Sequence, residues 1–184
     1  MKKLVIKGKR IDLIIPTMKD VDDICRNIND KLVAKYMSNV PHPYKRKDGE
    51  FFIKKIVKKG LKAKTDYPLS IYEKQKKEVI GGIGLHNIDK NNQRAEVGYW
   101  LGRKYWRQGY ISEALGMILN FGFRRLKLRK IWAGVYHPNI PSQKLLMKAG
   151  FAKEGLLRKH TLKSSKEYDN VMFGMLREEY ERKK

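Results

Sequence analysis

The spacing of apolar residues predicts a chain of short strands interrupted by amphipathic helices. Alternating or β-branched runs predict strands over residues 10–15, 67–73, 78–88, 93–101, 130–136, 151–158 and 170–176. Polar turns join the three strands between residues 67 and 101, so we expect them to form an antiparallel meander. Gly81, Gly82 and Gly84 lie inside the second of these strands, where glycine marks a bulge or a close approach of backbones.

Capping residues and helical spacing predict the helices. Thr17 followed by Asp20 is a capping-box pattern that begins a helix ending near residue 27. Further helices are predicted over residues 30–37, 48–62 and 139–149, and from residue 109 onward. The proline-interrupted loop over residues 38–44 is expected to form the rim of a cleft. Because no linker or repeat separates these elements, we expect one α+β domain over residues 1–184, with a mixed, mostly antiparallel central sheet flanked by helices.

The chain is strongly basic, since its 184 residues carry a formal net charge of +23 at pH 7. This charge fits a polyanionic partner such as ribosomal RNA, a phosphorylated ligand, or a lysine-rich proteome. On the helix over residues 48–62, apolar residues form one stripe and lysines the opposite face, so we favour a solvated face over a nucleic-acid site. Aromatic residues near residue 105 offer base-stacking faces, but we favour packing in the core or in a cleft for all four: Trp100, Tyr105, Trp106 and Tyr110.

Several classes of protein are excluded by what the chain lacks. A single cysteine, Cys25, rules out a disulfide framework and fits a reducing cytoplasm. Cys25 shares helical spacing with Val21, Ile24 and Ile28, so we predict that it packs in the core. No apolar run approaches the ~20 residues of a membrane span. The four histidines lack metal-ligand spacing, so no metal site is predicted: His42, His86, His137 and His160.

The stretch over residues 95–114 carries the strongest chemical signal. A predicted strand breaks into a basic loop containing Arg103, Lys104 and Arg107, and a helix begins at Gly109. Such a turn directs several free backbone N–H groups toward one point at the positive end of the helix dipole. This arrangement is typical of an anion site, most often a phosphate site. The nucleoside-triphosphate and dinucleotide loop motifs are both absent.

Two motifs in this order resemble those of the GNAT N-acetyltransferases. The run from Trp106 through Gly109 to Ile111 is similar to the acyl-CoA loop [QR]-x-x-G-x-[GA], with Trp106 and Ile111 departing from it. The longer string from Glu96 to residue 110 resembles the RimJ/RimL branch, which acetylates protein N-termini. The run from Asn139 to residue 151 resembles a second GNAT motif, N-x-x-[AS]-x(7)-G-F. Similar segments after residue 151 extend the resemblance over nearly the whole chain.

The resemblance implies an acyl-CoA N-acyltransferase fold, acetyl-CoA as the acyl donor, and a set of residues that hold it. By this resemblance, the strand along the pantetheine arm contains Tyr99, Trp100 and Leu101. The pyrophosphate is bound by Arg103, Arg107, Gln108, Gly109, Tyr110, Ile111 and Ser112. The residues near the thioester are Asn139 and Ser142. Many members place a tyrosine four residues after the Ser142 position to protonate the leaving thiolate. Leu146 stands there in this chain, so Ser142 and water are the candidate acids.

The acceptor is expected to be an amine. An α-amine of pKa ~7.8 is about one-third neutral near pH 7.5, whereas a lysine of pKa ~10.4 is only about a thousandth neutral. An α-amine therefore needs only a weak base, and Glu96 is the carboxylate we expect to hold a water or take the proton. The alternatives are that Glu96 only pairs with Arg94 or a lysine, and that Ser142 is only a first-turn helix hydroxyl.

We therefore predict an N-acetyltransferase that acts on a protein N-terminus by direct attack in a ternary complex. A small amine such as a polyamine or an aminoglycoside is the alternative acceptor, which the positive charge disfavours. From another class, a non-catalytic RNA- or ribosome-binding module also fits the charge. The oligomeric state is left open, with a homodimer among the options.

Overall fold

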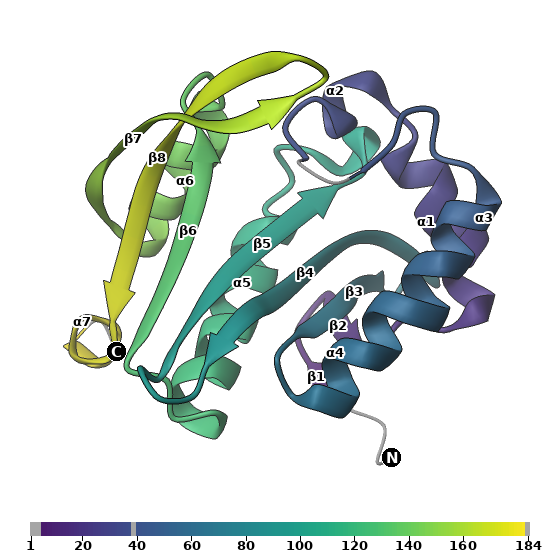
Figure 1. Ribbon diagram of the computed structural model, residues 1–184. Helices are drawn as coiled ribbons and strands as arrows, with labels where there is room; N and C mark the ends of the chain where they lie inside the picture. Colours follow the sequence, from purple (N-terminus) through teal and green to yellow (C-terminus); the bar gives the residue numbers. More distant parts are fainter. Residues whose placement is uncertain (1–4, 38–39, 183–184) are drawn as a thin grey trace.

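A computed structural model describes residues 5–37 and 40–182, and within them it forms one eight-stranded sheet (Figure 1). The strands follow the order β1-β2-β3-β4-β5-β6-β8-β7, with bounds Val5–Lys7, Ile11–Ile14, Tyr67–Glu73, Glu78–Asp89, Arg94–Leu101, Lys130–Tyr136, Lys166–Leu176 and Ala152–Lys163. Among these neighbours only β5 and β6 run parallel. The predicted mixed, mostly antiparallel sheet is confirmed, and so is the meander of β3, β4 and β5.

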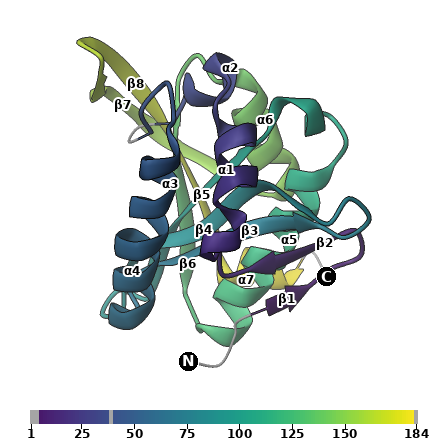
Figure 2. The ribbon, with the colours of Figure 1, turned by 90° about the vertical axis from the view of Figure 1, so that its right-hand side faces the viewer.

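Helices cover both faces of the sheet. One face carries η1 (Met18–Asp20), α1 (Val21–Ile28), α2 (Lys31–Ala34), α3 (Arg46–Phe51), η2 (Phe52–Val57) and α4 (Lys58–Ala63). The other carries α5 (Tyr110–Asn120), η4 (Phe121–Arg125) and α6 (Ile140–Ala149), while η3 (Arg103–Tyr105) follows β5 and α7 (Arg177–Arg182) follows β8. Figure 2 shows α3 and α4 continuing as one column beside α1. Among the described residues, no helix has the length and apolar content needed to cross a bilayer.

Most predicted elements lie where the pattern placed them, and the misses have physical causes. The Thr17 N–H donates to the Asp20 carboxylate at 2.6 Å, as the capping-box pattern predicted. The closing strands are longer than predicted, because their polar, exposed outer halves carry no apolar alternation. Strand β1 and helix α7 were not predicted, and α2 is shorter than the predicted helix over residues 30–37. Residues 38 and 39 of the predicted proline-rich loop lie outside the described residues.

Two apolar clusters sandwich the sheet. The larger one joins the α5 side of the sheet to α5 and η4, with Leu85, Leu115 and Phe173 fully buried. The smaller cluster lies between α1, η2 and the opposite face, and Cys25 and Trp100 pack against it. Cys25 was predicted to pack in the core; it contacts this cluster but is only partly buried. Ile56 was predicted in the apolar stripe, but it is 48% exposed because the π-helical turn of η2 rotates it out of register.

Glycines in β4 let β5 approach closely. A methyl group on Gly81 would lie 2.5 Å from the Trp100 backbone oxygen. Gly82 pairs with Trp100, and a methyl group on Gly82 would lie 2.4 Å from the indole nitrogen. The register with β3 also shifts beside Gly81, so the sequence-based prediction of a bulge or close approach is confirmed on both counts.

Replacing Gly82 by alanine is expected to lower the free energy of unfolding by about 1–3 kcal/mol, because Trp100 must move to admit the methyl group. Gly116 is the matched control: it lies exposed within α5, and nothing lies within 4 Å of a methyl group placed there. Gly116→Ala should raise the free energy of unfolding by about 0.5–1 kcal/mol. Urea unfolding followed by tryptophan fluorescence measures both changes, and equal effects of the two substitutions would contradict the close contact.

Candidate active site

The parallel strands β5 and β6 separate in the middle of the sheet. They pair only from Arg94 with Lys130 to Glu96 with Trp132, after which β5 continues along β4 and β6 along β8. Figure 1 shows the two strands diverging toward β5's C-terminal end. A cavity of about 1440 Å³ lies at this opening and is lined from both faces of the sheet. The edge of β5 beyond Glu96 can therefore bond an extended ligand.

The loop after β5 has backbone geometry suited to the anion site that the sequence predicts. Arg107 (φ 60°) and Gly109 (φ 78°) both adopt left-handed backbone conformations just before α5 begins at Tyr110. Among the described residues, none accepts a hydrogen bond from the backbone N–H groups of residues 107–112. These donors lie at the N-terminus of an 11-residue helix, where the dipole adds positive potential. They suit the phosphates of a ligand that enters the cavity.

An arginine from the N-terminal strand region holds this loop in place. Arg10 donates from its guanidinium to the backbone oxygen of Gln108 and to the Glu113 carboxylate, each at 2.9 Å. Burial acts to raise the pKa of Glu113, but hydrogen bonds from the backbone and side chain of Arg10 outweigh it and lower that pKa. The Trp106 indole N–H also donates to the Leu101 oxygen at 2.8 Å. The loop is therefore pre-organised for binding rather than ordered by the ligand.

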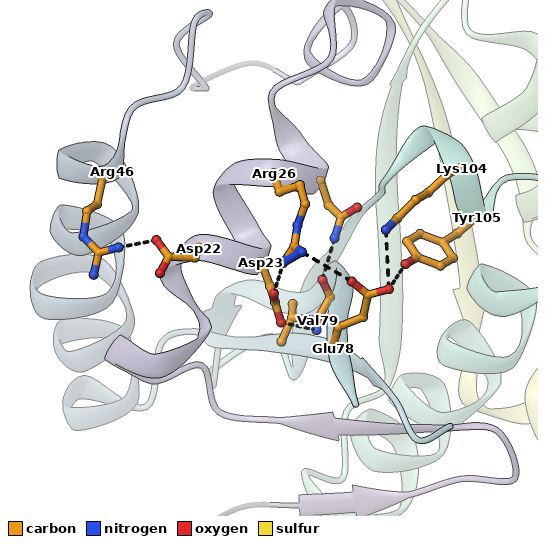
Figure 3. A network of polar contacts seen from close by, with 9 residues as sticks. Asp22, Asp23, Arg26, Arg46, Glu78, Val79, Lys104 and Tyr105 are labelled. Atoms are coloured by element: carbon orange, nitrogen blue, oxygen red, sulfur yellow. Dashed lines mark hydrogen bonds and ion pairs between the residues drawn. The ribbon is translucent and has the colours of Figure 1, made fainter. Parts of the chain in front are cut away.

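A second polar network joins the loop to α1 and the start of β4 (Figure 3). Tyr105 is fully buried, and its hydroxyl donates to Glu78, whose carboxylate also lies 4.0 Å from Arg26. Burial raises the pKa of Tyr105 and the bond to Glu78 adds to this, so the phenol keeps its proton. Arg26 also pairs with Asp23, which accepts a hydrogen bond from the Val79 N–H at 3.0 Å. The loop and α1 therefore share one set of polar contacts.

Ser142 lies on the first turn of α6 and contacts a partly buried tyrosine. The Tyr99 and Ser142 hydroxyl oxygens are 2.7 Å apart, and the Ser142 N–H donates to the capping Asn139 side chain at 3.4 Å. Burial raises the pKa of Tyr99 to about 12, although the Ser142 bond opposes this shift, so the phenol stays protonated. Leu146 is fully buried in the core, which leaves Ser142 and Tyr99 as hydroxyl groups on this wall. Sequence reasoning missed the Tyr99 hydroxyl because the resemblance concerned only its backbone.

Glu96 reaches the cavity from the opposite face of the sheet. Alternation along β5 points Glu96 and Trp100 toward the α1 side and Tyr99 toward α5 and α6. The Glu96 carboxylate accepts a hydrogen bond from the Asn87 amide at 2.9 Å. Arg94 pairs instead with Asp89 at 3.3 Å, so the alternative Glu96–Arg94 pair is not formed. Glu96 and Ser142 thus line one cavity from its two sides.

Most of the predicted site residues line this cavity, namely Glu96, Tyr99, Trp100, Leu101, Arg107, Gly109, Tyr110, Ile111, Ser112, Asn139 and Ser142. Two predicted residues direct their side chains elsewhere. Arg103 lies 3.7 Å from Asp30, and the Gln108 amide donates to the Lys104 backbone oxygen at 2.8 Å. Within residues 5–37 and 40–182, no cluster of three or more His, Cys, Asp or Glu side chains is arranged to hold a metal.

Known proteins are similar to this chain in sequence and in fold. Residues 10–152 match the Acetyltransferase (GNAT) domain. The uncharacterized N-acetyltransferase p20 of Bacillus licheniformis is 37% identical over 172 residues, covering 94% of this chain and 96% of that one. The ribosomal-protein-serine acetyltransferase of Escherichia coli is 33% identical over 81 residues, covering 44% and 45% of the two chains. A GNAT-family acetyltransferase structure from Bacillus anthracis superposes with a TM-score of 0.82 at 26% identity, covering 95% and 99%.

The chain therefore belongs to the GNAT acetyltransferase family. It is an acetyl-CoA-dependent N-acetyltransferase, and the sequence-based prediction of this enzyme class is confirmed.

Proposed function

We propose that this GNAT enzyme acetylates the α-amine of a protein N-terminus, with the amine attacking acetyl-CoA directly in a ternary complex. The observation that carries the proposal is the single cavity through the opening between β5 and β6. The anion loop and Ser142 lie on one side of it and Glu96 on the other, so donor and acceptor can bind together. The relative from Escherichia coli that is named for a ribosomal-protein serine supports a protein acceptor.

The residues present fit acetyl-CoA. The free N–H groups of residues 107–112 suit its diphosphate, and the open edge of β5 suits the amide groups of its pantetheine arm. When bound, acetyl-CoA supplies the thioester carbonyl that the amine attacks. Glu96 holds the amine or an ordered water beside it, and Ser142, backed by the protonated Tyr99 hydroxyl, delivers a proton to the leaving sulfur.

The charge of the protein also bears on the acceptor. A net charge of +23 repels polyamines and aminoglycosides, whereas it attracts a ribosomal substrate surrounded by RNA phosphates. The lysines of the helix predicted over residues 48–62 do lie on its exposed side, among them Lys54, Lys55, Lys58 and Lys59. We place the reaction in the cytoplasm, where ribosomes and acetyl-CoA meet.

Calorimetry with coenzyme A and a three-member acceptor panel test this function. We expect micromolar coenzyme A binding, and acetylation of a lysine-free peptide with a free N-terminal serine. The same peptide carrying an N-terminal formyl group and one lysine should be acetylated at least about 100-fold more slowly, because so little of its amine is neutral. Absence of coenzyme A binding would contradict the donor site. Faster turnover of spermidine than of the free peptide would replace the protein acceptor by a small amine, and salt-sensitive RNA binding without turnover would indicate a non-catalytic module.

A further inference from the structure

The acceptor side of the cavity contains an imidazole, that of His86, which has no role in the proposed acetyl transfer. His86 lies on β4 directly opposite Glu96, and both side chains line the cavity. The His86 ring lies over Gly84 and Gly98, where methyl groups would come within 2.8 and 3.8 Å of Nε2. Gly84 leaves room for the ring to lie against the backbone of β4. The Nε2 edge therefore lies over Gly84, which itself lines the cavity.

A fixed carboxylate lies at the other edge of this ring. The Asp66 Oδ1 atom is 3.4 Å from His86 Nδ1. Asp66 is itself held by the Thr65 hydroxyl at 2.7 Å and by the Asn87 N–H at 3.3 Å. A carboxylate beside Nδ1 favours the tautomer that carries its proton there, which leaves the Nε2 lone pair free as an acceptor. The arrangement is that of an oriented general base.

The surroundings of His86 and Glu96 suit these two side chains to different roles toward the acceptor amine. Asp66 and Glu96 are the titratable groups that face His86. The cavity wall contributed by η2 and β3 consists of Phe52, Ile56 and Pro68 with the hydroxyl-bearing Ser70. Glu96 already accepts the Asn87 amide through one oxygen. An imidazole is intrinsically more basic than a carboxylate, so it is the better acceptor for the proton of an amine. Glu96 is better suited to holding the amine.

We propose that His86, oriented by Asp66, takes the proton that the acceptor amine loses, while Glu96 binds the amine; this assignment rests on the proposed function. The amine nitrogen forms a bond to the thioester carbonyl carbon, and one of its protons passes to His86 Nε2. The carbon–sulfur bond breaks with its electron pair on sulfur, which receives a proton from Ser142, and the Ser142 oxygen regains a proton from solvent. His86 then releases its proton to solvent. Asp66 is a positioning residue, because it acts only through the ring.

The first test compares His86→Gln with Asp66→Asn in the purified enzyme, with His160→Gln as control, since His160 is exposed on β7 away from the cavity. His86→Gln should lower kcat about 100-fold or more and abolish the acid limb of the kcat–pH profile. Asp66→Asn should lower kcat about 10-fold while keeping an acid limb. The Kd for coenzyme A of all three variants should stay within about two-fold of the wild-type value, which also verifies that they fold. The kcat and pH profile of His160→Gln should likewise stay within about two-fold of wild type.

The second test needs no turnover. Two-dimensional ¹⁵N NMR of the imidazoles in the free protein should show His86 as the Nδ1–H tautomer, with a shift toward Nε2–H in Asp66→Asn. An acid limb that survives in His86→Gln but vanishes in Glu96→Gln would assign the proton to Glu96 and overturn the proposal. An Nε2–H tautomer in the wild-type protein would overturn it as well. Failure of the function itself would appear differently, as absent coenzyme A binding or absent turnover in the wild-type enzyme.

Discussion

Ser142→Ala will lower kcat for acetyl transfer by about 100-fold or more, while the Kd for coenzyme A stays nearly constant. The expected loss follows from general acid catalysis, because a thiolate that leaves without a proton is a poorer leaving group at neutral pH. Ser142 lies on the first turn of α6 at the cavity wall, and the core side chain of Leu146 offers no hydroxyl in its place. Rapid-quench single-turnover kinetics isolate this step from product release.

Tyr99→Phe tests whether the two hydroxyl groups act as one unit. The Tyr99 hydroxyl is 2.7 Å from Ser142 and keeps its proton because burial raises its pKa to about 12. Its loss should lower kcat by about 10-fold, and Ser142→Ala/Tyr99→Phe should be no slower than Ser142→Ala alone. Tyr168→Phe is the control, because Tyr168 does not itself line the cavity, and its ring stacks on Tyr136, which does. Multiplying effects in the double variant would show that the two hydroxyl groups act independently. A Ser142→Ala enzyme within three-fold of wild type would show that Ser142 does not supply the proton.

Glu78→Leu is expected to destabilise the protein and to weaken coenzyme A binding together. The substitution leaves the fully buried Tyr105 hydroxyl without its acceptor, which costs about 1–3 kcal/mol. Lys104, 3.4 Å from Glu78, loses its partner too, so the loop before α5 becomes less ordered. If binding must supply about 1 kcal/mol to reorder that loop, the Kd for coenzyme A rises about five-fold.

Glu78→Gln separates charge from hydrogen bonding at this position. Its amide oxygen can still accept from Tyr105, so we expect most of the stability and affinity to return. Thermal unfolding and calorimetry measure the two quantities, and a loss of about 2 kcal/mol corresponds to a fall in Tm of about 4–8 °C in a chain of this size. Equal losses in both variants would mean that the negative charge matters more than the buried hydroxyl.

The elements and the donor loop were predictable because their signals are local. Strands over residues 67–73 and 130–136 follow from alternation, and the loop before α5 is marked by Gly109 and basic residues within one short run. The contacts that complete the site are not local. Arg10 reaches Glu113 across 103 positions, and Tyr99 reaches Ser142 across 43. No spacing rule predicts such pairs, because they depend on which strands become neighbours.

The role of His86 was hidden for the same reason. In the sequence it is one of four histidines without metal spacing, and its distance from Asp66 gives no sign of contact. Only the pairing of β3 with β4 and of β4 with β5 brings Asp66, His86 and Glu96 to one place. The exposed outer halves of β7 and β8 were missed differently, because solvent on both sides removes the apolar alternation that identifies a strand.

The short parallel ladder between β5 and β6 has a mechanical consequence. Only three residue pairs join the two halves of the sheet directly, from Arg94 with Lys130 to Glu96 with Trp132. In the proposed binding mode, a donor bonded to β5 and to the start of α5 fills the opening between β5 and β6 and contacts the β6 and α6 wall of the cavity as well. Donor binding therefore raises the free energy of unfolding, by about 2.7 kcal/mol when the free donor is at 100 times its Kd. The thermal resistance of this enzyme will consequently follow the supply of acetyl-CoA.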